Sequence, residues 1–334
     1  MEIILFIPLF LGFFFTLFFI PRWIKKAKEE GLSGKDMHKV SKEEVAEAGG
    51  VCVIIGFILG VLVYIAIKTF YYNLNPDDKI LEIITMISVI LMVAFIGFTD
   101  DILGWKKGLS KIVRIFFIIF ASLPLVVISA GALTFGGINL GLAYPFLLIP
   151  IGIVGASLTF NFLAGYNGLE TSQGILILFA LSLVTYLRGT TWLSMLGLIM
   201  VACLFAFYIF NKHPAKVFPG DVLTYSIGAL IAGMAILGDI EKIAIFFFIP
   251  YILETILKVR GRLKKESFAK VNEDGTIEMP YSKIYGLEHL AIYILKKIKP
   301  SKKVYEKEVV YLINAFQILL IVIGFVIFRG DIFI

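Results

Sequence analysis

Long stretches without a charged side chain recur along the whole chain, and they restrict its fold more than any other feature. A helix of about 20 apolar residues is long enough to cross the hydrocarbon core of a bilayer. The 17% of residues that are charged gather between these stretches, whereas a water-soluble protein would spread them through amphipathic elements. The sequence therefore predicts an all-α integral membrane protein, with residues 1–334 forming a single polytopic domain.

The apolar stretches predict about ten transmembrane helices, judged by the length that spans a bilayer. They lie at residues 3–21, 49–67, 80–98, 112–131, 143–164, 173–187, 191–210, 222–238, 242–258 and 308–328. The first stretch has neither a basic leader nor a small-residue cleavage site after it. We therefore expect a retained span there and not a signal peptide.

Basic residues mark one side of the predicted bundle. The loops after the odd-numbered spans contain about 25 of the 31 Lys and Arg residues, and loops rich in these residues face the cytoplasm. This predicts a multi-pass protein of the cell membrane with both termini outside. It also accounts for the formal net charge of +6 without nucleic acid as a partner, because basic loops are attracted to an anionic inner leaflet.

Two segments outside the spans have a predicted structure of their own. Residues 133–141 (LTFGGINLG) have the pattern of a small hairpin. Residues 259–307 are the only long excursion, with a hairpin through Asp274-Gly275 and then an amphipathic helix, LEHLAIYILKKIK, that we expect on the bilayer surface. We expect this segment to lie on the cytoplasmic face and to cover a site there.

Unusual polar residues occur in the loops after the odd-numbered spans, and they predict a site at the cytoplasmic face. Carboxylates and carboxamides suit Mg²⁺, with Mn²⁺ as an alternative, and Arg and Lys suit phosphate oxygens. A site with both kinds of group indicates phosphoryl transfer. The oxygen donors are Asp100, Asp101, Asn161, Asn167 and Asp221, and the cations are Lys39, Lys111, Arg260 and Arg262. Taken singly, each of these residues can also be read as a helix cap or a topology charge.

Cysteine and histidine do not predict a metal centre. Cys52 and Cys203 both lie inside apolar stretches, so no disulfide or metal-thiolate site is expected. His38 and His213 lie in loops with no partner at metal-ligand spacing, and we assign them no metal role.

Taken in order, several short motifs resemble one membrane enzyme family. The motifs are GKDMHK, AEAGG, GFTDDILG, NFLAGYNGLE, HPAKVFPGD and EMPYSK, collinear from about Gly34 to Ile284. They resemble the polyprenyl-phosphate N-acetylhexosamine-1-phosphate transferases of glycosyltransferase 4 type, most closely the dolichyl-phosphate branch. The resemblance implies transfer of GlcNAc-1-phosphate from UDP-GlcNAc to a polyprenyl (dolichyl) phosphate in the membrane. UMP would be released, and the product would be the first lipid-linked sugar of N-glycan assembly.

The same resemblance implies a role for each matching residue. Asp221 and Asn161 would be Mg²⁺ ligands, and Asn167 and Glu47 would contact uridine. Arg260 and Arg262 would contact the diphosphate and the sugar, and Lys39 would also bind substrate. Asp100, Asp101 and Lys111 would form the catalytic group near the lipid phosphate. Asp100 and Asp101 would either remove a proton from that phosphate or orient Lys111.

Three departures from the family pattern limit what the resemblance implies. Gly261 stands where many members have a histidine, which excludes a catalytic histidine at that position. His38 stands where relatives commonly have asparagine, and no proline precedes Glu47. A bacterial undecaprenyl-phosphate sugar-1-phosphate transferase and, outside enzymes, a multi-span transporter remain as alternatives. A homodimer is also left open.

Overall fold

The computed structural model describes residues 3–72, 79–104 and 108–333, and helices occupy most of each predicted span. The α-helices of the bundle are α1 (Ile7–Glu29), α2 (Gly50–Ala66), α3 (Ile80–Leu103), α4 (Lys111–Val127), α5 (Ile149–Phe160), α6 (Leu169–Leu187), α7 (Thr191–Asn211), α8 (Gly220–Leu237), α9 (Glu241–Phe247), α10 (Ile249–Arg260) and α12 (Glu306–Ile327). Short helical turns precede α1 (η1, Ile3–Phe6), follow α2 (η2, Ile67–Tyr71), precede α5 (η3, Tyr144–Leu148) and follow α12 (α13, Arg329–Ile332). The amphipathic helix is α11 (Leu287–Ile298).

Helices of this length and composition make the chain an all-α multi-span membrane protein. Among the described residues, seven helices are long and apolar enough to cross a bilayer, and a shorter apolar helix covers Tyr144–Phe160. The predicted total of about ten spans stays a prediction.

The helix boundaries differ from the prediction where a backbone hydrogen bond is interrupted. The predicted span 242–258 is two helices, α9 and α10, which meet at Phe248 two residues before Pro250. Proline lacks the N–H that a continuous helix would need there, so the helix breaks although the sequence stays apolar. The first span, in contrast, continues eight residues beyond Pro21 and ends at Glu29.

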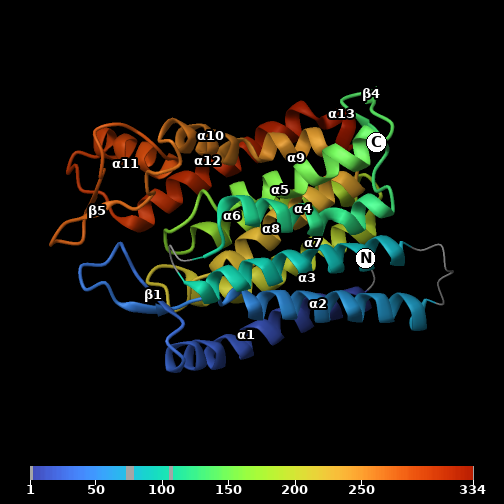
Figure 1. Cartoon of the computed structure of the whole chain (residues 1–334), viewed down its shortest axis with the longest axis horizontal. Helices are drawn as coiled ribbons and strands as arrows, with labels where there is room; N and C mark the ends of the chain where they lie inside the picture. Colours follow the sequence, from blue (N-terminus) through green and yellow to red (C-terminus); the bar gives the residue numbers. More distant parts are fainter. Residues whose placement is uncertain (1–2, 73–78, 105–107, 334) are drawn as a thin grey trace.

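The two ends of the bundle differ (Figure 1). Both termini lie at one end, together with the hairpin of β3 (Thr134–Phe135) and β4 (Ile138–Asn139). The other end carries α11 and two further hairpins, β1 with β2 (Ser33–Lys35 with Glu44–Ala46) and β5 with β6 (Lys270–Val271 with Ile277–Glu278). Both predicted hairpins are therefore confirmed, whereas the β1–β2 pair was not predicted. Which end faces the cytoplasm stays a prediction.

Helix α8 lies at the centre of the bundle and places its first turn among the other helices. It packs against α2, α3, α5 and α6, and most of its residues are buried. Gly97 allows α3 to approach closely, because a Cβ atom at that position would lie 2.5 Å from the Asp221 carbonyl oxygen. The last turn of α3, with its two aspartates, is therefore held beside the first turn of α8.

The segment 259–307 packs onto the bundle through buried polar contacts. The backbone N–H of Leu287 donates to Glu254 Oε2 at 2.6 Å, which fixes the start of α11 against α10. Lys258 Nζ contacts Ser267 Oγ one loop further on. The amphipathic helix is confirmed, and its apolar face packs against α12. That this segment covers a site stays a prediction. Cys52 and Cys203 are both buried and free.

Candidate active site

Asp100 is held in an ion pair with an arginine from the next helix. Its Oδ2 lies 2.8 Å from Nε of Arg114, one turn into α4, and its Oδ1 accepts a hydrogen bond of 2.6 Å from the Leu109 backbone N–H. The Asp100 side chain is only 3% exposed, so its charge needs these partners. Arg114 is 28% exposed, and its remaining N–H groups can reach a ligand.

Asp101 caps the start of α8. Its two carboxylate oxygens accept hydrogen bonds from the backbone N–H groups of Asp221 (2.7 Å) and Val222 (3.1 Å). The first N–H groups of a helix have no partner within the helix, and a carboxylate there is favoured by the helix dipole. Gly220 makes room for this contact, since its φ is +72° and a Cβ would lie 2.3 Å from Asp101 Oδ2. Asp101 therefore fixes the position of Asp221.

Asp221 joins α8 to the end of α5 through its side chain. Its Oδ1 accepts a hydrogen bond of 2.8 Å from Nδ2 of Asn161, at the end of α5. Its Oδ2 accepts a hydrogen bond of 2.7 Å from the Tyr225 hydroxyl, one turn further along α8. That hydroxyl also lies 3.3 Å from Asp100 Oδ2 and accepts from Arg114 Nη1 at 3.2 Å. These residues form one group, which we call the aspartate cluster: Asp100, Asp101, Arg114, Asn161, Asp221 and Tyr225.

A short backbone pairing brings Glu47 toward the aspartate cluster. Ala46 forms a parallel bridge with Val217, and the Gly49 N–H donates to the Phe218 carbonyl oxygen. Gly220 is so close to this strand that a Cβ would lie 2.9 Å from Cα of Ala48. Burial raises the pKa of Glu47, as expected for a carboxyl group with little access to water.

A second group of polar residues gathers around Glu306, the first residue of α12. Glu306 Oε1 accepts a hydrogen bond of 2.7 Å from the Asn167 backbone N–H and lies 3.4 Å from Nδ1 of His38. Glu306 Oε2 lies 2.9 Å from Nδ1 of His213. Asn167 Nδ2 donates to Asp36 Oδ2 at 3.0 Å and to Glu306 Oε2 at 3.4 Å. We call these residues the glutamate cluster: Asp36, His38, Asn167, His213 and Glu306.

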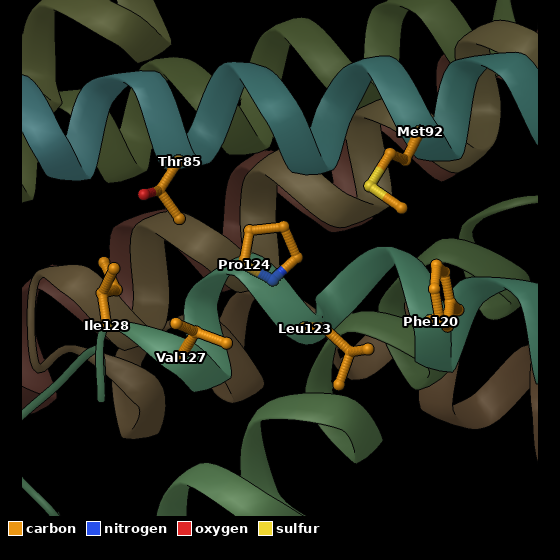
Figure 2. A pocket seen from close by; sticks show the side chains of 7 residues that line it. All are labelled: Thr85, Met92, Phe120, Leu123, Pro124, Val127 and Ile128. Atoms are coloured by element: carbon orange, nitrogen blue, oxygen red, sulfur yellow. The ribbon is translucent and has the colours of Figure 1, made fainter.

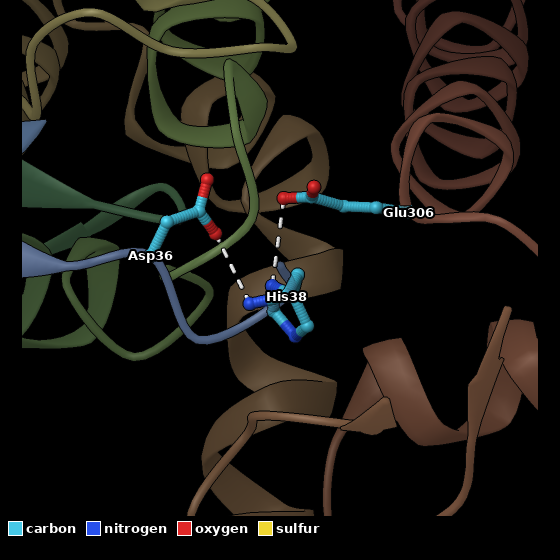
Figure 3. Close-up of side chains that lie close together, drawn as sticks. All are labelled: Asp36, His38 and Glu306. Atoms are coloured by element: carbon cyan, nitrogen blue, oxygen red, sulfur yellow. Dashed lines mark hydrogen bonds and ion pairs between the residues drawn. The ribbon is translucent and has the colours of Figure 1, made fainter. Parts of the chain in front are cut away.

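Asp36, His38 and Glu306 lie close enough together to resemble a metal site (Figure 3). The hydrogen bonds account for them without a metal. His38 Nε2 accepts from the Ala269 backbone N–H at 3.1 Å, so Nδ1 carries the proton that points at Glu306. Asp36 Oδ1 accepts from the His38 backbone N–H at 3.0 Å. Because both ring nitrogens are engaged, His38 has no lone pair to offer a metal ion.

The glutamate cluster gives stability a dependence on pH through His213. Its hydrogen bond to Glu306 raises the pKa of His213 above the ordinary value of 6.5. A raised folded-state pKa means that the stabilisation is complete below pH 6.5 and is lost as pH rises through the folded-state value. With the side chain 38% exposed, we expect a contribution of about 1 kcal/mol or less.

We expect His213→Gln to be less stable than the unchanged protein at pH 6 and nearly equal to it at pH 9. Thermal unfolding in detergent across this range measures the difference. A gap between the two proteins that grows as pH rises would contradict the assignment.

Three predicted cationic residues lie apart from both clusters. Lys111 is exposed in the first turn of α4, one turn before Arg114. Arg260 is exposed at the end of α10, with its guanidinium carbon 6.0 Å from the centre of the Tyr285 ring, and Arg262 is exposed just beyond. Lys39 lies nearer, with Nζ 3.7 Å from Asp36 Oδ2. In the described part of the chain, Asp100 is thus paired with Arg114 rather than with Lys111.

Of two hollows in the described part of the chain, only the smaller borders one of these groups. An apolar groove of about 410 Å³ runs between α3 and α4, with Thr85 and Met92 on one side and residues from Phe120 to Ile128 on the other (Figure 2). Its lining suits hydrocarbon and not a charged ligand. A cavity of about 70 Å³ borders the glutamate cluster, and Asn167 and His213 are among its lining residues.

Sequence reasoning missed several members of the two clusters. Arg114 lies inside an apolar stretch, and a charge in such a stretch is itself a signal of function. Tyr225 lies one helical turn after Asp221 and so shares its face. Glu306 offered no signal, because its partners lie 93 or more residues away along the chain.

The fold and the aspartate cluster define a multi-span membrane protein with an oxygen-rich polar site at one end of its helices. The model of the family described as Glycosyl transferase family 4 matches residues 83–239, which carry the whole aspartate cluster. The chain is 32% identical over 292 residues to a protein of Sulfolobus acidocaldarius named "Putative UDP-N-acetylglucosamine--dolichyl-phosphate N-acetylglucosaminephosphotransferase", covering 85% of this chain and 86% of the relative. The chain belongs to glycosyl transferase family 4.

Two further relatives show how broad the family is. A protein of Saccharolobus solfataricus with the same name is 36% identical over 288 residues, which cover 83% of this chain and 85% of the relative. A phospho-N-acetylmuramoyl-pentapeptide-transferase of Streptococcus thermophilus is 28% identical over 262 residues, which cover 73% and 75%.

Proposed function

We propose that this protein transfers GlcNAc-1-phosphate from UDP-GlcNAc to a dolichyl-type polyprenyl phosphate. The observation that carries the proposal is the aspartate cluster, in which Asp100 with Arg114 and Asp221 with Asn161 meet within one hydrogen-bonded group. The two relatives named for this reaction are 32% and 36% identical, against 28% for the relative named for the muramoyl-pentapeptide reaction. This favours the dolichyl branch, and family membership argues against a transporter.

The reaction needs no nucleophile from the protein. A phosphate oxygen of the lipid attacks the sugar-bearing phosphorus of UDP-GlcNAc. The bond from that phosphorus to the bridging oxygen breaks, and the electron pair leaves with UMP. The product is GlcNAc joined to the lipid through a diphosphate. Phosphoryl transfer of this kind depends mainly on positioning and on neutralising negative charge.

The donor atoms of the aspartate cluster fit Mg²⁺. Asp221 and Asn161 offer one carboxylate and one carboxamide oxygen, and hard cations prefer such ligands. Each Asp221 oxygen accepts one hydrogen bond and keeps a lone pair free for a cation. When bound, the ion would supply positive charge at the diphosphate. Mn²⁺ offers the same chemistry.

The remaining residues divide between positioning and phosphate binding. Asp101 holds the first turn of α8 and thereby aims Asp221. Asp100 orients the Arg114 guanidinium, whose free N–H groups would meet the acceptor phosphate together with Lys111. Arg260 and Arg262 would bind the diphosphate of the donor, and Asn167 and Glu47 would contact its uridine. All of these residues would lie at the cytoplasmic face of the cell membrane, and the product would enter N-glycan assembly.

A direct assay tests the proposed function. Purified protein in detergent is incubated with radiolabelled UDP-GlcNAc, Mg²⁺ and dolichyl phosphate, and labelled lipid is extracted. We expect labelled lipid that depends on both the metal and the acceptor. Labelled lipid only with UDP-MurNAc-pentapeptide and undecaprenyl phosphate would instead place the protein in the bacterial branch.

The assignment of the donor diphosphate to Arg260 predicts a kinetic defect. Lysine keeps the charge but cannot reproduce the planar pair of N–H donors that a guanidinium offers to phosphate. We expect Arg260→Lys to lower kcat/KM for UDP-GlcNAc about 10- to 100-fold, with little change in KM for the lipid. Arg329→Lys, in α13 near the other end of the bundle, serves as the control. A raised lipid KM with unchanged UDP-GlcNAc kinetics would reverse the assignment of the two phosphate sites.

A further inference from the structure

The amide of Asn167 is held in a single orientation. Both hydrogens of Nδ2 are used, one toward Asp36 Oδ2 at 3.0 Å and one toward Glu306 Oε2 at 3.4 Å. Rotating the amide by half a turn would place its oxygen against two carboxylates, which repel it. Within the described part of the chain, Oδ1 accepts no hydrogen bond. Oδ1 is therefore the side-chain atom that remains for a ligand, and it can only accept.

Glu306 holds this orientation by drawing donors from several loops. It is 4% exposed, so its charge depends on hydrogen bonds from the protein. The donors come from His38 in the first loop, from Asn167 after α5 and from His213 after α7. His38 in turn accepts from Ala269 in the loop after α10. One residue at the start of α12 thus ties together the loops that carry most of the predicted substrate-binding residues.

We propose that Glu306 and Asp36 are positioning residues that make the nucleotide-base subsite selective for a base with a ring N–H. This rests on the proposed function, in which Asn167 contacts uridine. Uracil presents N3–H as a donor to Asn167 Oδ1, whereas cytosine presents an unprotonated N3 that would face the same oxygen. A buried acceptor facing another acceptor loses its hydrogen bond to water without replacement, and such mismatches discriminate strongly between ligands.

Competition between UMP and CMP for the full-length protein in detergent measures the selectivity without turnover. We expect the unchanged protein to bind UMP about 100-fold more tightly than CMP. Glu306→Gln keeps the size of the side chain, but its new NH₂ group faces donors and releases the Asn167 amide. We expect this variant to bind UMP about tenfold more weakly, while its affinity for CMP changes little. The ratio of the UMP affinity to the CMP affinity therefore falls.

A matched control lies two residues away on the same helix. Glu308 bonds to Lys299 and to the Tyr305 backbone, away from the glutamate cluster. Glu308→Gln should keep both affinities. Asp36, in a different loop, accepts from the His38 backbone with Oδ1 and from the Asn167 amide with Oδ2. Asp36→Asn leaves one acceptor oxygen for these two donors, and it should narrow the UMP-to-CMP ratio as Glu306→Gln does. This second variant carries the test if Glu306→Gln fails to fold.

Three outcomes would overturn the inference. The first is an unchanged UMP-to-CMP affinity ratio in both Glu306→Gln and Asp36→Asn. The second is an equal loss of UMP and CMP binding, which would mean that the whole base subsite has lost its structure. The third is the same narrowing in Glu308→Gln. The radiolabelled-lipid assay on the unchanged protein separates these from failure of the proposed function. If labelled lipid forms and the ratio does not respond, only the inference fails; if no labelled lipid forms, the proposed function fails.

Discussion

Replacing Asp221 with asparagine is expected to lower kcat about 1,000-fold, because it removes the carboxylate charge assigned to Mg²⁺ and leaves the shape of the side chain. Asparagine can still accept from Tyr225, so the fold should persist and the thermal unfolding temperature should stay close to that of the unchanged protein. The measurement is formation of labelled lipid from UDP-GlcNAc at saturating Mg²⁺.

The control for this variant lies beyond the opposite end of α8. Asp239 accepts a hydrogen bond of 2.8 Å from the Ala132 backbone N–H, far along the helix from the aspartate cluster. Asp239→Asn should keep full activity. Near-normal turnover in Asp221→Asn would remove Asp221 from the metal site.

Arg114→Lys is expected to lower activity as much as Arg260→Lys does, but toward the other substrate. The guanidinium contacts Asp100 Oδ2 and the Tyr225 hydroxyl at the same time and keeps further N–H groups for a ligand. The single ammonium group of lysine cannot make both contacts. We expect kcat/KM for polyprenyl phosphate to fall about 10- to 100-fold, while KM for UDP-GlcNAc moves much less.

Arg188→Lys is the matched control, because Arg188 donates to the Asp331 carbonyl oxygen near the chain terminus and lies outside the aspartate cluster. Steady-state kinetics with each substrate varied in turn would measure both variants. A selective rise in KM for UDP-GlcNAc in Arg114→Lys would assign Arg114 to the donor and not to the acceptor.

Helix positions could be predicted from sequence, but their interruptions could not. A charge-free stretch of about 20 residues has few alternatives to a membrane helix, because an unpaired backbone group in hydrocarbon costs several kcal/mol. Apolar character says little about where the helix hydrogen bonds stop. The break at Phe248 between α9 and α10 and the early end of α5 at Phe160 therefore fell inside predicted spans.

Parts of the aspartate cluster were also accessible from sequence, because Asp100, Asn161 and Asp221 are polar residues at the ends of apolar stretches. Their partners were not. Asp100 pairs with Arg114, although the sequence resemblance pointed to Lys111, and the choice depends on which face of α4 turns toward α3. Asp101 proved to be a cap for α8, a role that needs the close approach of two helices at Gly97 and Gly220.

The sequence by itself determined the class of protein, and it predicts the side of the bundle that carries the chemistry and the kinds of ligand atom available there. Those properties follow from composition and from the length of each apolar stretch, which act locally along the chain. Only the tertiary structure decided which charges pair. Glu306 meets Asn167, which is 139 residues away, and Asp101 meets the backbone of Asp221, which is 120 residues away. Contacts over such separations arise from helix packing, and no local pattern in the chain encodes them.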